Sequence, residues 1–191
     1  MLIGVLALQG AFIEHQKMLG KCGIESVQVR KPEQLTDIAG LIIPGGESTT
    51  IGKLLNQFSL FEPLIDKAKN GMPIFGTCAG LIMLAKEIKN SNQPRLGLMD
   101  IVAERNAYGR QVDSFEADLE IECLGSQPLR AVFIRAPYIE EVNNGAEVLA
   151  VHNKKIVLAR QGRFLAAAFH PELTEDTRLH DYFLNIVKSC C

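Results

Sequence analysis

The chain has 191 residues, a length that suits one domain with a sizeable hydrophobic core. Its hydrophobic fraction of 47% and charged fraction of 22% are typical of globular proteins and exclude a disordered chain. The formal net charge of −2, without a long basic block, argues against a partner that is a nucleic acid.

The apolar opening at residues 2–8 is too short to span a membrane and lacks the basic leader of a signal peptide. No later apolar run approaches the length that a bilayer requires, so no membrane partner is expected. Five cysteines occur at irregular spacing: Cys22, Cys78, Cys123, Cys190 and Cys191. An odd number without zinc-ligand spacing argues against a disulfide framework or a metal site and predicts a cytoplasmic location.

Apolar runs alternate with helical patterns through the first half of the chain. Residues 2–8 are nearly all apolar, as expected of a strand that is covered on both faces. Apolar positions at helical spacing then predict a helix from Phe12 to Cys22, with Gly23 as its stop. Val27 and Val29 mark a second short strand.

The same alternation continues beyond residue 40. Residues 41–43 and 73–75 are short apolar strands, and each precedes an amphipathic pattern, at 51–58 and at 81–88. Strand, helix, strand, helix implies crossover connections and a parallel sheet.

The second half contains few helical patterns. Short strand candidates separated by turns lie at 119–123, 129–135, 148–152, 156–160 and 164–169. Residues 176–187 read as a closing helix. We therefore expect an α/β fold over residues 1–191 as a single three-layer domain. Its central sheet should be mostly parallel with helices on both faces and antiparallel additions in the second half.

The sharpest chemical signal is the segment Phe75-Gly76-Thr77-Cys78-Ala79-Gly80. A strand ends, small residues flank a nucleophile and a helix begins, which is the layout of a nucleophile elbow. The flanking glycines let neighbouring backbone approach closely, and a helix beginning after Cys78 favours thiolate over thiol. A lone cysteine would be read as a buried core residue; the flanking pattern favours a nucleophile.

A thiol nucleophile needs a base, and the chain has four histidines. His15 and His180 fall inside helical patterns, where a structural role is the default, and His152 precedes a polar turn. His170 ends an apolar strand, with Glu172 placed to orient the imidazole. A lone His-x-Glu would be read as a solvated turn.

The segment Pro44-Gly45-Gly46-Glu47 follows a predicted strand. Two glycines can turn backbone N–H groups toward an anion, such as the oxyanion of a tetrahedral intermediate. The plainer interpretation is a loop followed by a helix N-cap at Ser48 or Thr49. The segment lacks the lysine of a nucleotide-binding P-loop.

These three segments, in this order, resemble the class I (triad) glutamine amidotransferases. Longer stretches are similar, within that family, to the glutaminase subunits of pyridoxal 5′-phosphate synthases. The similar stretches run from end to end of the chain: 4–14 (GVLALQGAFIE), 44–50 (PGGESTT), 76–87 (GTCAGLIMLAKE), 104–117 (ERNAYGRQVDSFEA), 133–137 (FIRAP) and 169–176 (FHPELTED).

The resemblance implies a catalytic triad of Cys78, His170 and Glu172, with oxyanion donors from the Gly45–Gly46 peptide. Cys78 would attack the side-chain amide of L-glutamine and form a glutamyl thioester. The resemblance also implies a set of glutamine-binding residues: Gly46, Glu47, Ser48, Arg105, Ile134 and Arg135. Free glutamine carries a carboxylate and an ammonium group, so its site needs both a cation and an anion.

The resemblance further implies a partner, a pyridoxal 5′-phosphate synthase subunit in a hetero-oligomer that receives the ammonia. It implies no cofactor and no metal, since pyridoxal 5′-phosphate would be the product of the complex. Three alternatives remain open at this point. They are the glutaminase of another amidotransferase, such as imidazole glycerol phosphate synthase, a non-catalytic binding module on the same fold, and a cysteine peptidase on a related sheet.

Overall fold

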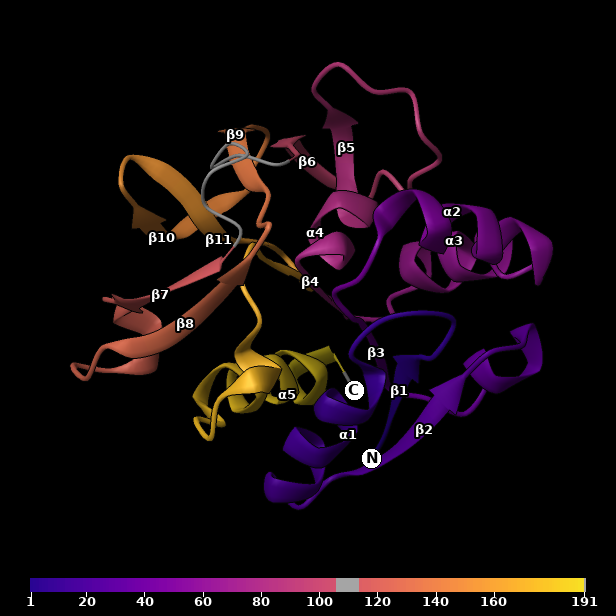
Figure 1. The fold of residues 1–191 in the computed structure, drawn as a ribbon. Coiled ribbons are helices and arrows are strands. Elements are labelled where there is room, and N and C mark those ends of the chain that lie inside the picture. Colours follow the sequence, from indigo (N-terminus) through magenta and orange to yellow (C-terminus); the bar gives the residue numbers. More distant parts are fainter. Residues whose placement is uncertain (106–113, 191) are drawn as a thin grey trace.

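The computed structural model describes residues 1–105 and 114–190 (Figure 1). Residues 106–113, which belong to the similar stretch 104–117, and Cys191 lie outside the described residues. No helix in the described part of the chain is long and apolar enough to cross a bilayer.

The centre of the molecule is a sheet of ten strands within the described residues. Its strand order is β2 (Glu25–Val29), β1 (Leu2–Leu6), β3 (Gly40–Ile43), β4 (Ile74–Thr77), β12 (Phe164–Ala167), β11 (Lys155–Gln161), β9 (Tyr138–Val142), β6 (Met99–Glu104) and β5 (Ala85–Ile88). Strand β10 (Glu147–His152) pairs with β11 off this path, and β7 (Ser114–Leu119) pairs with β8 (Leu129–Ile134) in a separate ladder.

The sheet combines the two pairing modes that the sequence predicts. Strands β2, β1, β3, β4 and β12 are all parallel to their neighbours in that row. Strand β11 pairs antiparallel with β12, β9 and β10, and β6 pairs antiparallel with β9. Strands β3 and β4 are buried at every residue, because a parallel strand between helical layers needs apolar side chains on both faces.

Helices cover both faces of the parallel strands (Figure 1). Helices α1 (Phe12–Lys21) and α5 (Arg178–Cys190) lie side by side on one face, and α2 (Ser48–Gln57) and α3 (Phe61–Lys69) lie on the other. The short helix α4 (Ala79–Leu84) follows β4 directly, and 3₁₀ turns occur at Pro32–Leu35, Glu122–Leu124 and Pro171–Leu173. The predicted three-layer α/β architecture is confirmed.

Some local predictions were wrong. The helix expected over 81–88 ends at Leu84, because Ala85 adopts extended dihedrals and begins edge strand β5. Buried Ala85 and Ile88 flank exposed Lys86 and Glu87, which is the i, i+3 pattern of a helical turn; β5 carries it with a register shift between Ala85 and Glu87 in its pairing with β6.

The strand expected at 119–123 was also misplaced. Strand β7 ends at Leu119, and residues 122–124 form a 3₁₀ turn. The register of β7 is set by its pairing with β8, in which Phe115 lies opposite Phe133 with ring centroids 4.6 Å apart. The sequence analysis missed α3, β6 and β9 altogether.

Candidate active site

The predicted site residues gather at one edge of the sheet. Strands β1, β3, β4 and β12 are adjacent and parallel, so their carboxyl ends lie together. The loop 7–11 follows β1, the glycine loop 44–47 follows β3, Cys78 follows β4 and His170 follows β12. The carboxyl edge of such a sheet is where α/β folds bind ligands.

Cys78 stands on a sharp turn between β4 and α4. Its backbone has φ 50° and ψ −101°, a region that residues with a side chain rarely occupy. Flanking glycines make the turn possible: a Cβ at Gly80 would lie 2.1 Å from the carbonyl oxygen of Ile43, and one at Gly76 would lie 2.5 Å from that of Gly80. This geometry is the predicted nucleophile elbow.

His170 and Glu172 form a buried pair beside this turn. The backbone N–H of His170 donates to the carbonyl oxygen of Val132 at 2.8 Å, which fixes the chain after β12. Nδ1 of His170 lies 2.7 Å from Oε1 of Glu172, and both residues are buried. A carboxylate in this position selects the tautomer and orientation of the imidazole.

The three side chains of the predicted triad meet. A Cβ built on Gly45 would lie 2.3 Å from Cε1 of His170 and 3.2 Å from Cβ of Cys78, so both side chains touch the same glycine. Burial disfavours the imidazolium ion, but the hydrogen bonds of His170 with Cys78 and Glu172 outweigh it and raise its pKa to about 10. The site therefore favours a protonated His170 at neutral pH.

The carboxylate of Glu172 can balance the positive charge of a protonated His170. Burial opposes ionisation of its carboxyl group, yet the hydrogen bond with His170 and the charge of that imidazolium help to hold the pKa of Glu172 below the usual value. An ionised carboxylate stabilises an imidazolium ion beside it.

A cavity of about 300 Å³ opens in front of the triad. Its lining includes Cys78, His170 and all six residues predicted to bind glutamine: Gly46, Glu47, Ser48, Arg105, Ile134 and Arg135. Glu172 does not line it, because it lies behind the imidazole of His170. The cavity carries cationic groups, one carboxylate and a nucleophile, which matches the charges of an amino acid.

Two of the predicted binding residues have a clear local structural role. Glu47, not Ser48 or Thr49, is the N-cap of α2, and its carboxylate accepts from the backbone N–H groups of Thr49 and Thr50 at 3.2 and 2.7 Å. Burial opposes ionisation, but the hydrogen bonds from Thr49 and Thr50 lower the pKa of Glu47 to about 2. Arg105 donates to Oε1 of Gln93 at 2.6 Å.

Arg135, which also lines the cavity, has a positive φ of 42°, an uncommon conformation that places strained backbone there. The preceding carbonyl oxygen, that of Ile134, lies 3.9 Å from Sγ of Cys78.

The glycine loop is held by the segment after β1. The carbonyl oxygen of Gly45 accepts from the backbone N–H of Ala11 at 3.2 Å, and Oε1 of Gln9 accepts from that of Glu47 at 2.8 Å. The sequence analysis missed Gln9, although it lines the cavity. Its place directly after a buried parallel strand was the available signal.

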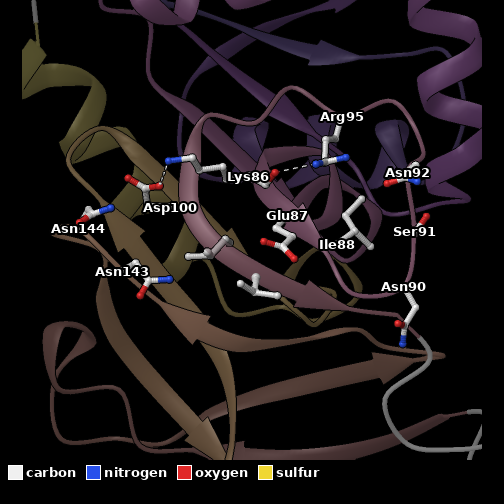
Figure 2. A pocket seen from close by; sticks show the side chains of 12 residues that line it. Lys86, Glu87, Ile88, Asn90, Ser91, Asn92, Arg95, Asp100, Asn143 and Asn144 are labelled. Carbon is white, nitrogen blue, oxygen red and sulfur yellow. Dashed lines mark hydrogen bonds and ion pairs between the residues drawn. The ribbon is translucent and has the colours of Figure 1, made fainter.

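A larger hollow of about 680 Å³ lies away from the triad, along β5 and β6 (Figure 2). Its lining is mostly polar and includes the ion pair between Lys86 and Asp100 at 2.5 Å. Among the residues that the structure describes, no cysteine and no histidine lines it, so we assign the chemistry to the smaller cavity.

Comparison with known proteins agrees with this arrangement. Residues 5–189 match the model of a family described as the SNO glutamine amidotransferase family. The chain is 69% identical over 188 residues to the pyridoxal 5′-phosphate synthase subunit PdxT of Desulforamulus reducens, covering 98% of this chain and 100% of the relative. It is 71% identical over 184 residues to the subunit of the same name from Pelotomaculum thermopropionicum, covering 96% and 94%. A crystal structure of a glutamine amidotransferase superimposes with a TM-score of 0.93 at 52% identity, covering 97% and 98%.

Proposed function

The chain belongs to the SNO glutamine amidotransferase family, and we propose that it is the glutaminase subunit of a pyridoxal 5′-phosphate synthase. It hydrolyses L-glutamine to L-glutamate and delivers the ammonia to the synthase subunit. The observation that carries the chemistry is the meeting of Cys78, His170 and Glu172 at the wall of one cavity. The PdxT names of the relatives support the choice of acceptor enzyme over imidazole glycerol phosphate synthase.

In the proposed reaction, the thiolate of Cys78 attacks the amide carbon of glutamine and the carbonyl electrons move to oxygen. The imidazolium of His170 gives its proton to the amide nitrogen, the C–N bond breaks and ammonia leaves. A water molecule then gives a proton to His170 and attacks the glutamyl thioester. The C–S bond breaks, which releases glutamate and restores the ion pair.

We assign the stabilisation of the oxyanion, in both tetrahedral intermediates, to the Gly45–Gly46 peptide. Because a trans peptide directs its C=O and N–H to opposite sides, the Gly46 N–H faces away from Ala11, to which the Gly45 carbonyl is bound. Gly46 lines the cavity, and in this proposal its N–H reaches the oxyanion once the synthase subunit binds and the Gly45–Gly46 peptide turns.

Glutamine is held at both of its charged ends in this proposal. Arg105 and Arg135 supply the cations for the α-carboxylate, and Glu47, whose pKa is lowered, supplies the anion for the α-ammonium. Gly46, Ser48 and Ile134 complete the wall.

We place this single glutaminase domain in the cytoplasm. The described cysteines Cys22, Cys78, Cys123 and Cys190 are free thiols, in keeping with a reducing compartment.

The test is glutamate release at saturating glutamine, measured with a pyridoxal 5′-phosphate synthase subunit and, separately, with the cyclase subunit of an imidazole glycerol phosphate synthase. We expect strong glutamate release with the first and little with the second. Cys78→Ala is the control for contaminating glutaminase. Stimulation by the cyclase alone would reassign the acceptor, and no glutamate release in any mixture would overturn the glutaminase.

A further inference from the structure

A line of buried polar side chains continues behind Glu172, on the side away from the cavity. His15 on α1 and His180 on α5 have no exposed surface. Nδ1 of His15 lies 3.0 Å from Nε2 of His180, and Nε2 of His15 lies 3.3 Å from Oε2 of Glu172. Oγ1 of Thr77, the residue before Cys78, lies 3.1 Å from Nε2 of His15.

The two carboxylate oxygens of Glu172 therefore face two different histidines. Oε1 is 2.7 Å from Nδ1 of His170, whereas Oε2 is buried and has no hydrogen bond of good geometry to any described residue. A buried carboxylate oxygen without a donor is costly. The ring nitrogen of His15 lies at ion-pair distance from it and can supply that donor.

The protonation of the two histidines follows from burial. Burial lowers the pKa of His15, against the opposing effect of Glu172, with smaller effects from His170 and Glu14. Burial and the neighbouring His15 lower the pKa of His180 to about 3, although Glu172 raises it. Both rings are then neutral, and each carries a single N–H.

One tautomer pattern fits the surroundings. If His15 carries its proton on Nε2, that N–H faces both Oγ1 of Thr77 at 3.1 Å and Oε2 of Glu172 at 3.3 Å, and Nδ1 of His15 accepts from the Nε2–H of His180. The reverse pattern would turn the lone pair of Nε2 toward the carboxylate and would leave an N–H at Nδ1 of His180, an atom with no partner among the described residues. Orphaned buried N–H groups are rare, so the first pattern is favoured.

We propose that His15, held by the neighbouring His180, is a positioning residue of the active site. Its Nε2–H holds Oε2 of Glu172, so that Oε1 stays aligned with Nδ1 of His170. The inference rests on the proposed function, because it assigns His15 a role in supporting the triad. It extends the triad through two histidines whose place inside helical patterns suggested a structural role.

The competing explanation is packing alone. The rings of His15 and His180 lie edge-on to Phe75, with centroids 6.3 and 6.0 Å away. A packing role requires volume and shape, whereas a positioning role requires the N–H at Nε2. Two substitutions separate them: His15→Gln retains an amide N–H near the position of Nε2, and His15→Met retains a similar volume without a donor.

Two readouts are measured for each variant. The first is kcat for glutamine hydrolysis with the synthase subunit present, and the second is the pH dependence of Cys78 alkylation by iodoacetamide, which needs no turnover. We expect His15→Met to lower kcat about 10- to 100-fold, as for a lost hydrogen bond to a charged group, with KM unchanged. Its alkylation profile should move to higher pH, because a less well held Glu172 supports the imidazolium of His170 less.

The conservative variant His15→Gln should recover most of kcat and the original alkylation profile. His152→Met and His152→Gln are the matched controls, since His152 is partly buried against Phe115, at a ring distance of 5.5 Å, and does not line the cavity. Neither control should change either readout.

A folded His15→Met variant with wild-type kcat and alkylation profile would overturn the proposal, and so would equal losses in His15→Met and His15→Gln. If His15→Met does not fold, the same comparison is made at His180, the neighbour of His15 on the side away from Glu172. His180→Gln keeps an N–H donor, and His180→Phe removes it. Greater activity of His180→Gln supports the proposal, and equal activity rejects it. Failure of the proposed function would appear separately, as absent glutamate release by the wild-type protein.

Discussion

The backbone N–H of Cys78 donates a hydrogen bond to the carbonyl oxygen of Ala167 across 2.8 Å. This bond joins the end of β4 to the end of β12, the strand that leads to His170. Cys78 and His170 are therefore positioned by adjacent, buried, parallel strands rather than by free loops, which limits relative movement of the two side chains.

Cys78→Ala should abolish glutamate release and leave the fold intact, because the variant loses the sulfur but keeps a small side chain on the turn. Circular dichroism and the unfolding midpoint check the fold, and a coupled glutamate assay checks activity. Cys123→Ala is the matched control, since Cys123 is exposed and outside the cavity. Near-normal turnover by folded Cys78→Ala would remove Cys78 as the nucleophile.

His170→Asn should lower kcat by about 10²–10⁴-fold, the usual contribution of a general acid or base. Because the triad acts as a unit, adding His170→Asn to Cys78→Ala should cost little more than Cys78→Ala alone. The measurement is kcat for both single variants and the double variant, with His152→Asn as the control histidine. A fully active His170→Asn enzyme would refute the assignment.

Gly80→Ala should destabilise the elbow by about 1–3 kcal/mol, as expected for overpacking against backbone. Its Cβ would lie 2.1 Å from the carbonyl oxygen of Ile43, and backbone of a buried strand has little freedom to move. Gly20→Ala, at a position in α1 with nothing within 4 Å, should instead be neutral or stabilising by up to about 1 kcal/mol. Urea unfolding of both variants tests the contrast, and equal effects would contradict it.

The raised pKa of His170 predicts a pH-dependent contribution to stability. The folded value is about 10 and the ordinary value 6.5, so the folded state binds the proton more tightly than the unfolded state. The stabilisation is then fully present below pH 6.5 and is lost as the pH rises through about 10. The free energy of unfolding of wild type minus that of His170→Asn should fall across this window, and a constant difference would argue against a charged His170.

The sequence predicted those parts of the molecule in which the position of a residue in the fold restricts which residue types can occur there. The apolar runs of β1, β3 and β4 and the glycines around Cys78 are such cases, because burial on both faces and a tight turn each restrict the residue types directly. The three chemical segments, through their family resemblance, then indicated Cys78, His170 and Glu172 as a triad; the carboxyl edge of the sheet brings these residues together, and their catalytic roles stay a prediction.

Other features depend on partners distant in sequence. Strand β5 was read as helix because its two buried positions lie three residues apart, as on a helix face, and pairing with β6, with a register shift, makes the segment a strand instead. Nothing local marks His15 as a neighbour of Glu172, since that contact exists only after α1 and η3 (Pro171–Leu173) pack together. The capping role of Glu47 was missed because Ser48 is itself a favourable N-cap residue.

The synthase subunit should control the activity of the glutaminase. Ammonia in water escapes or is protonated, so a glutaminase that feeds a synthesis should be active mainly when bound to its acceptor. We expect weak glutaminase activity alone and strong stimulation by the pyridoxal 5′-phosphate synthase subunit. The expected switch is reorientation of the Gly45–Gly46 peptide, whose carbonyl oxygen now accepts from Ala11 N–H at 3.2 Å.

Loss of one oxyanion donor typically costs about 10²–10³ in rate, which is enough to keep the unbound enzyme nearly silent. Gly46→Val should prevent this reorientation, because a branched side chain restricts the backbone at residue 46, and its Cβ, 2.3 Å from Oε1 of Gln9, would also displace that side chain. The variant should lose stimulation but retain alkylation of Cys78, whereas Gly20→Val, in open space on α1, should retain both. Glutamate release is measured with and without synthase subunit at saturating glutamine. Equal wild-type rates in the two conditions would reject the switch and leave the glutaminase assignment standing, because hydrolysis itself would still be observed.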